Sequence, residues 1–84
     1  MENKKKLLNR ILYRSTHRGT KEMDILLGGF VKRYINIFND NDLFDLDKLL
    51  SCDDEIIYKW YFNKENHKII ENNKITKMLS DYKL

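Results

Sequence analysis

The chain has 84 residues, of which 42% are hydrophobic and 12% aromatic. A chain of this length closes one modest core and leaves no room for a second domain, while its bulky apolar residues argue against disorder. Sixteen Lys and Arg against thirteen Asp and Glu give a net charge of +3, with both signs scattered along the chain, which is too mild for a protein that binds polyanions by charge alone. We therefore predict one domain over residues 1–84.

The first predicted element is a helix from about residue 3 to residue 16. Four apolar residues near the N-terminus recur at helical spacing: Leu7, Leu8, Ile11 and Leu12. The polar stretch before Gly19 ends this helix. The lysines at 4–6, together with Arg10 and Arg14, make one of its faces basic. A basic helical face is either a solvated surface or a contact for an acidic partner or a membrane surface.

The second predicted element is the strongest and covers residues 20 to 38. Its apolar residues fall on one side of a helix: Met23, Leu26, Leu27, Phe30, Val31, Tyr34, Ile35 and Phe38. Gly28 and Gly29 lie inside it, where each glycine costs about 1 kcal/mol relative to alanine. Two explanations stay open for this pair, namely a neighbouring helix that crosses closely or a smooth patch for a partner's backbone.

Turn and cap residues at 39–42 separate the second helix from a third, whose buried face is formed by leucines between 43 and 50. Asp53 is expected to accept hydrogen bonds from the first N–H groups of a fourth helix. The expected buried face of that helix is Ile56, Ile57, Trp60 and Tyr61, with Trp60 as its core anchor.

A last helix is predicted from the apolar residues between Ile69 and Tyr82, although Asn72 and Asn73 interrupt its apolar face. No stretch alternates at period two for long enough to indicate a strand. The predicted fold class is therefore all-α, a small bundle of about five short helices.

The sequence offers little for catalysis or for binding a cofactor. Cys52 is the only cysteine, so it forms no intramolecular disulfide and fits a reducing compartment. His17 and His67 lie far apart in the sequence, and no glycine-rich phosphate-binding motif occurs. No apolar run approaches the roughly 20 residues that cross a bilayer. We expect no catalytic residue, no metal site and no integral membrane segment.

The junction between the first two helices is a different case, because it contains residues suited to binding a partner. Gly19 permits a sharp turn and leaves room for another protein's main chain. Arg18 offers a planar fork of donors, and Glu22 is an acceptor about one turn away. Such a pair forms a docking surface, or else the two side chains simply pair with each other for about 0.2 to 0.5 kcal/mol. The residues alone leave both readings open.

Two blocks of the sequence resemble a known family. Arg18-Gly19-Thr20-Lys21-Glu22, followed by residues 23–30, is similar to the signature of the succinate dehydrogenase FAD assembly factors, which help flavinylation. Residues 49–60, with two leucines, an acidic turn and a tryptophan in that order, resemble the family's second block. The resemblance covers about residues 8 to 76.

The resemblance implies a five-helix assembly factor, not an enzyme, that binds the flavoprotein subunit of succinate dehydrogenase. Fumarate reductase is a second candidate client. The factor would promote covalent attachment of FAD to a histidine of that subunit, and FAD would belong to the client rather than to this chain. Arg18, Gly19 and Glu22 match the family's functional positions one by one. We add His17, where the family usually has a basic residue, and Asp24 as predicted partner contacts.

The resemblance also suggests where the protein acts. Mitochondrial members of the family carry an import segment, whereas this chain starts almost directly at its first helix, so we expect a bacterial cytoplasm. We also expect a monomer in solution. The alternative from another class is a small helical nucleic-acid-binding module, suggested by a sequence pI near 9.0. Such a module should concentrate basic residues on one exposed helix, but here they alternate with acids.

Overall fold

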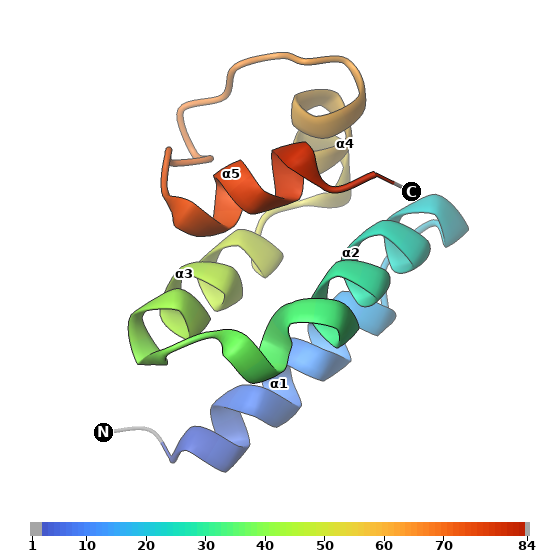
Figure 1. The fold of residues 1–84 in the computed structure, drawn as a ribbon. Coiled ribbons are helices and arrows are strands. Elements are labelled where there is room, and N and C mark those ends of the chain that lie inside the picture. The colour runs from blue at the N-terminus through green and yellow to red at the C-terminus, as the bar shows by residue number, and fades with distance from the viewer. Residues whose placement is uncertain (1–2, 84) are drawn as a thin grey trace.

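The computed structural model describes residues 3–83, so Met1, Glu2 and Leu84, at the ends of the predicted domain, lie outside the described residues. The helices are α1 (Lys4–Thr16), α2 (Lys21–Tyr34), α3 (Asp40–Leu50), α4 (Asp54–Phe62) and α5 (Lys74–Asp81), with a short 3-10 turn, η1 (Ile35–Ile37), after α2 (Figure 1). No strand occurs among residues 3–83, and the predicted all-α class is confirmed.

One core joins the five helices. In Figure 1, α1 and α2 lie side by side, α3 packs against α1, and α5 lies over α3. Each helix contributes at least one fully buried side chain to this core: Ile11 from α1, Phe30 from α2, Leu46 from α3, Ile57 from α4 and Leu79 from α5. The spacing of apolar residues in the sequence therefore identified the inward face of every helix.

The second helix ends earlier than the predicted span of 20 to 38. α2 stops at Tyr34 and gives way to η1, although Phe38 still reaches the core and is only 6% exposed. The cause is the start of α3. The Asn39 side chain accepts from the backbone N–H of Asp42 at 2.8 Å, and the Asp42 carboxylate accepts from the N–H of Asn39 at 3.2 Å. This capping box fixes a new helix and bends the chain before it.

The last helix begins later than predicted. Ile69 and Ile70 lie in the loop before α5, although Ile70 is still buried, at 8% exposure. Asn73 is the N-cap of α5, because its side chain accepts from the N–H of Thr76 at 2.9 Å. The polar residue that seemed to interrupt an apolar face is the residue that starts the helix.

The buried face of α4 is narrower than predicted. Ile57 and Tyr61 are buried, whereas Ile56 and Trp60 are only partly buried against the core. The expectation that Trp60 is a core anchor therefore holds only in part. Asp53 stands at the N-cap position, and its main-chain carbonyl accepts from the N–H groups of Ile56 and Ile57. Its side chain makes no capping hydrogen bond, so the predicted side-chain cap is wrong.

The two glycines inside α2 are explained by close packing. A Cβ on Gly28 would stand 3.4 Å from the carbonyl oxygen of Ser15 in α1, and a Cβ on Gly29 would stand 2.8 Å from the Tyr82 hydroxyl. At Gly28 the near atom belongs to the main chain of α1, which supports the explanation by a closely crossing helix. At Gly29 the near atom is the end of the Tyr82 side chain and not a neighbouring helix.

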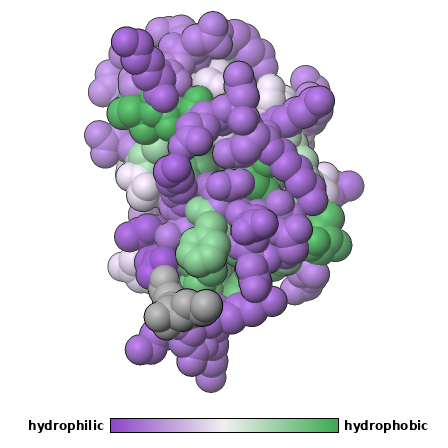
Figure 2. Space-filling view, turned by 90° about the vertical axis from the view of Figure 1, so that its left-hand side faces the viewer, coloured by the Kyte–Doolittle hydropathy of each residue, from purple (hydrophilic) through white to green (hydrophobic). Residues whose placement is uncertain are grey.

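The face shown in Figure 2 is mostly hydrophilic. On the face shown in Figure 2, apolar side chains stand apart from one another among hydrophilic ones. Isolated apolar residues of this kind are normal on soluble surfaces. Within residues 3–83, every helix is too short or too polar to cross a membrane.

Replacing the N-cap of α5 tests this account of where the last helix begins. We expect Asn73→Ala to lower the free energy of unfolding by about 1 kcal/mol, because the N–H of Thr76 loses its acceptor. Urea unfolding followed by circular dichroism measures the change. The adjacent Asn72→Ala is the matched control, since Asn72 is exposed and caps nothing. Equal losses in the two variants would show that Asn73 does not start the helix.

Candidate functional site

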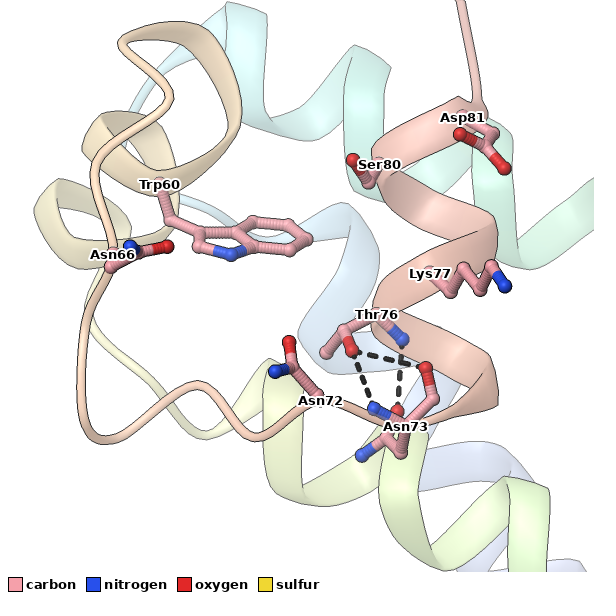
Figure 3. A pocket seen from close by; sticks show the side chains of 8 residues that line it. All are labelled: Trp60, Asn66, Asn72, Asn73, Thr76, Lys77, Ser80 and Asp81. Carbon is pink, nitrogen blue, oxygen red and sulfur yellow. Dashed lines mark hydrogen bonds between the residues drawn. The ribbon is translucent and has the colours of Figure 1, made fainter.

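A hollow of about 520 Å³ lies between the end of α4, the following loop and α5 (Figure 3). Its lining is Trp60, Asn66, Asn72, Asn73, Thr76, Lys77, Ser80 and Asp81. In Figure 3 the Trp60 indole reaches across it, while Asn73 and Thr76 are tied to each other. It holds neither histidine nor cysteine, and none of the predicted site residues lines it.

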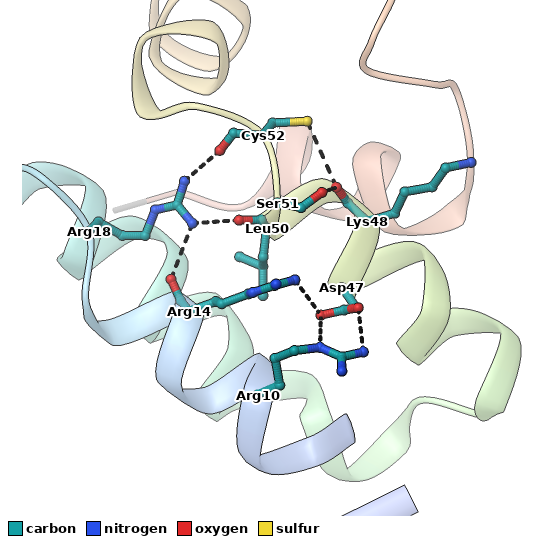
Figure 4. Close-up of polar contacts among 8 residues, drawn as sticks. All are labelled: Arg10, Arg14, Arg18, Asp47, Lys48, Leu50, Ser51 and Cys52. Atoms are coloured by element: carbon teal, nitrogen blue, oxygen red, sulfur yellow. Dashed lines mark hydrogen bonds and ion pairs between the residues drawn. The ribbon is translucent and has the colours of Figure 1, made fainter. Parts of the chain in front are cut away.

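The predicted site residues gather instead at the corner where α1 leads into α2. The Arg18 guanidinium is the centre of this corner, and its side chain is only 8% exposed. Its Nε donates to Asp54 Oδ1 at 2.6 Å. Its Nη atoms donate to three main-chain carbonyls: Leu50 at 2.6 Å, Cys52 at 2.7 Å and Arg14 at 3.2 Å (Figure 4).

The hydrogen-bond partners of Arg18 lie at or next to the ends of helices. The last carbonyl groups of a helix have no partner within it, and the C-terminal end of a helix attracts cations. Arg14 and Leu50 lie in the last turns of α1 and α3, and Asp54 is the first residue of α4. Arg18 therefore supplies a charged donor to two helix C-termini and an ion pair to the start of a third helix.

This geometry corrects the expected orientation of Arg18. The guanidinium does not stand open to a partner, because four of its hydrogen bonds are made within its own chain. Nor does it pair with Glu22, the other reading of the sequence, since its ion pair is with Asp54. The physical reason is that the corner lies against the α3–α4 turn, whose carbonyl groups need donors.

Position 19 is a glycine because a side chain would crowd Asp54, and not because the backbone adopts an unusual angle there. No glycine among residues 3–83 has a positive φ, so the predicted sharp turn at Gly19 is not the reason for a glycine. Its N–H donates to Asp54 Oδ2 at 2.5 Å, and a Cβ on Gly19 would stand 2.8 Å from that oxygen. Asp54 therefore holds Arg18 with one oxygen and Gly19 with the other.

Asp24 and His17 flank this centre. One carboxylate oxygen of Asp24 accepts from the backbone N–H of Arg18 at 2.6 Å. His17 is exposed, and its ring stacks on Tyr13 with centroids 4.0 Å apart. Its Nδ1 also lies 2.9 Å from the carbonyl oxygen of Tyr13. Asp24 thus supports the main chain of the corner, whereas His17 faces outwards.

Glu22 is exposed on the first turn of α2, and within residues 3–83 its carboxylate has no hydrogen bond or ion pair. The five predicted site residues therefore fall into two groups. Arg18, Gly19 and Asp24 are held by their own chain, while His17 and Glu22 face outwards. Whether these residues contact a partner remains a prediction.

The basic face of α1 is partly used inside the fold. Arg10 and Arg14 both pair with Asp47 of α3, at 2.8 and 3.2 Å (Figure 4). Asp47 is partly buried and lies between them, which ties α1 to α3. Both arginines therefore pair inside the fold, although their side chains stay partly exposed.

Asp54 is the residue of this corner that the sequence did not reveal. It stood in an acidic run typical of a helix start, and its two donors lie 35 and 36 positions earlier in the chain. The only available signal was that Asp54 belongs to one of the two blocks that resemble the family. Local spacing carries no information about such a distant contact.

A shallow hollow of about 360 Å³ opens beside the corner, with Cys52, Arg18 and His17 in its lining. Burial raises the pKa of the Cys52 thiol, and the charge of Arg18 opposes this shift only in part. A raised pKa leaves little thiolate near neutral pH, so Cys52 is poorly prepared to act as a nucleophile. No group of three or more His, Cys, Asp and Glu side chains in the described part of the chain is placed to hold a metal ion.

Comparison with known proteins gives consistent matches. A family model described as flavinator of succinate dehydrogenase matches residues 9–83. Succinate dehydrogenase assembly factor 2, mitochondrial, from Arabidopsis thaliana is 36% identical over 64 residues, which are 76% of this chain and 34% of the relative. Its counterpart from Debaryomyces hansenii is 37% identical over 78 residues, 86% of this chain and 54% of the relative.

A bacterial protein also matches. The FAD assembly factor SdhE of Acetobacter pasteurianus is 36% identical over 55 residues, 66% of this chain and 50% of the relative. The chain thus spans between about a third and just over half of the length of these three relatives. No solved structure matches the chain.

These matches correct the expected location. The relatives from A. thaliana and D. hansenii are named as mitochondrial assembly factors of eukaryotes, so a bacterial cytoplasm is not supported. The starting point of the chain, on which that expectation was based, does not distinguish the two settings, because both mitochondrial and bacterial relatives match the chain.

Removing the Arg18 side chain tests whether it is part of the internal framework. We expect Arg18→Ala to lower the free energy of unfolding by about 3 kcal/mol, because Asp54 and several carbonyls lose a buried charged donor. Urea unfolding measures the loss.

Glu22→Ala is the control for this experiment. It should change the free energy of unfolding by less than about 0.5 kcal/mol, because its carboxylate is exposed and without a partner in the described residues. Equal stability of the two variants would contradict the assigned geometry.

Proposed function

Because the chain belongs to the family of flavinators of succinate dehydrogenase, we propose that it is an assembly factor that binds the flavoprotein subunit of that enzyme and promotes covalent attachment of FAD. The observation that carries this proposal is the family match over residues 9–83, which covers most of α1, the four other helices and the whole corner. The names of relatives, succinate dehydrogenase assembly factor and FAD assembly factor, support it. Fumarate reductase is a second candidate client.

The geometry of the corner suggests that its residues have two different roles in client binding. Glu22 and His17 are exposed and would contact the flavoprotein subunit directly. Arg18, Gly19 and Asp24 would act from within, since their mutual bonds and those to Asp54 fix the shape that the two exposed side chains sit on. A surface already rigid before binding loses less conformational entropy when the complex forms.

The factor would act by selection of a client conformation and not by bond formation. The bond-forming chemistry is supplied by the client and its own cofactor, and this chain would bind no cofactor and act as no enzyme. A helper that binds the attachment-competent arrangement more tightly raises its population by that difference in affinity. Shifting a client from 1:99 to 99:1 requires a preference of about 5.5 kcal/mol.

The alternative of a nucleic-acid-binding module is not favoured by the structure. Three arginines of the N-terminal region are committed to carboxylates of the same chain, Arg10 and Arg14 to Asp47 and Arg18 to Asp54. Arginines engaged in this way are poorly available to neutralise phosphates.

An assay of covalent flavin tests the proposal. The flavoprotein subunit is produced in cells that lack their own assembly factor, alone or with this chain, and flavin fluorescence is measured on a denaturing gel. We expect the chain to raise covalent flavin and Glu22→Ala to reduce this effect by about three- to tenfold, because a contacting charge is lost. The control is Glu65→Ala, an exposed acid in the loop after α4.

The outcomes separate two claims. Equal covalent flavin with and without the wild-type chain would refute the function as an assembly factor. A flavin signal that depends on the chain but is unchanged by Glu22→Ala would refute only the role assigned to Glu22.

A further inference from the structure

A groove of about 410 Å³ lies between the first turn of α2 and the helix α4, and we call it the α2–α4 groove. Tyr58 forms its apolar wall and is 43% exposed, while the fully buried Met23 lies at its base. The Tyr58 ring packs on Phe62 with centroids 4.7 Å apart, which holds it in place from one side. The groove therefore presents an aromatic ring that is not part of the buried core.

The α2–α4 groove adjoins the corner. Thr20 lines it and directly follows Gly19 in the chain. Asp54 lines it as well, and the carboxylate of Asp54 holds both Arg18 and Gly19. The shallow hollow that contains His17 is also lined by Asp54. A protein that sits on the corner therefore meets both hollows.

Glu22 lies on the side of α2 that faces α4. Glu22 and Gly29 are seven positions apart, which places them on the same side of the helix. A Cβ on Gly29 would stand 2.8 Å from the Tyr82 hydroxyl, and the main-chain carbonyl of Tyr82 accepts a hydrogen bond from Tyr61 of α4. The exposed acid that we assign to client contact therefore borders the groove and immediately precedes Met23.

The charges around the groove are already paired within the chain. The Lys59 ammonium lies 3.0 Å from the Glu55 carboxylate, and both oxygens of Asp54 accept hydrogen bonds from the corner. Thr20 and Asn63, the other polar residues of the lining, are uncharged. Burying a charge without a partner is costly. The groove is therefore suited to an uncharged apolar group and not to a ligand that carries phosphates, such as a dinucleotide.

Two exposed polar side chains are a weak basis for a stable complex. Exposed charges contribute mainly to association rate and specificity, whereas affinity in protein interfaces is concentrated at aromatic residues and arginines that line well-packed pockets. A standard interface covers about 800 Å² on each partner. The exposed surface of this chain is 5797 Å², so such an interface covers about a seventh of it and extends beyond the side chains of His17 and Glu22.

From this arrangement we infer that an apolar side chain of the flavoprotein subunit enters the α2–α4 groove and packs on the ring of Tyr58. Tyr58 is the residue of the interface that contributes most to affinity, while His17 and Glu22 orient the client. The inference rests on the proposed function, because that proposal places the client on the corner.

Calorimetric titration of the chain into the isolated flavoprotein subunit tests the role of Tyr58. Tyr58→Ala should raise the dissociation constant about tenfold or more, whereas Tyr58→Phe should stay within about threefold of the wild type, because the ring remains. The matched control is Phe44→Ala, which should change the constant by less than about twofold. Phe44 is 58% exposed on α3 and lines neither the groove nor the hollow at the corner. Urea unfolding checks that each variant is folded.

Hydroxyl-radical footprinting of the wild-type chain measures the same contact without any substitution. Oxidation of Tyr58, read by mass spectrometry, should fall to a small fraction of its value in the free chain when the flavoprotein subunit is added. Oxidation of Phe44 should stay unchanged. Equal protection of Tyr58 by FAD alone, or by a higher concentration of the chain alone, would overturn the inference, because the occupant would then be a flavin or a second copy.

The two experiments distinguish this inference from the proposed function. If Tyr58→Ala binds the subunit as tightly as the wild type, or if Tyr58 stays reactive in the complex, the inference is wrong and the proposed function stands. If the wild-type chain does not bind the subunit at all, the proposed function is refuted together with the inference.

Discussion

The buried guanidinium of Arg18 is the interaction on which the corner depends. Every helix leaves unpaired carbonyl groups at its last turn, and in this fold the ends of α1 and α3 converge beside the start of α4. One side chain satisfies carbonyls of both ends and pairs with Asp54 at the third. The same carboxylate holds Gly19, so the link between α1 and α2 is fixed to α4 by two bonds to a single residue.

Periodicity predicted the helices well but not all of their ends. The first helix was predicted almost to the residue, because its apolar residues and the polar stretch after it agree. α2 and α5 were misjudged where a capping asparagine overrode the apolar pattern. Phe38 continues the apolar spacing past Tyr34, where α2 ends, and Ile70 begins it before Asn73, yet both apolar residues reach the core from outside an α-helix. Apolar spacing reports burial, whereas side-chain hydrogen bonds decide where a helix begins.

The site was predicted by residue identity and not by geometry. Resemblance to a family singled out Arg18, Gly19 and Glu22, and the structure places all three at one corner. Their orientations could not be predicted, because the partners of Arg18 in the α3–α4 turn lie 32 to 36 positions along the chain. Glu22 is exposed simply because it lies on the first turn of α2, away from its apolar side. Contacts distant in sequence leave no trace in local spacing.

The position of Arg18 at three helix ends also bears on how sequence changes would act in a living cell. Cellular proteases remove proteins in proportion to how often they unfold, so a substitution that loosens this junction would show itself first as a low amount of protein. If Glu22 has the proposed contact role, a substitution at this exposed residue would leave normal amounts of a protein that binds its client less well. Substitutions at two residues four positions apart in one motif would thus both lower activity in the cell, one by reducing the amount of protein and the other by weakening its contacts.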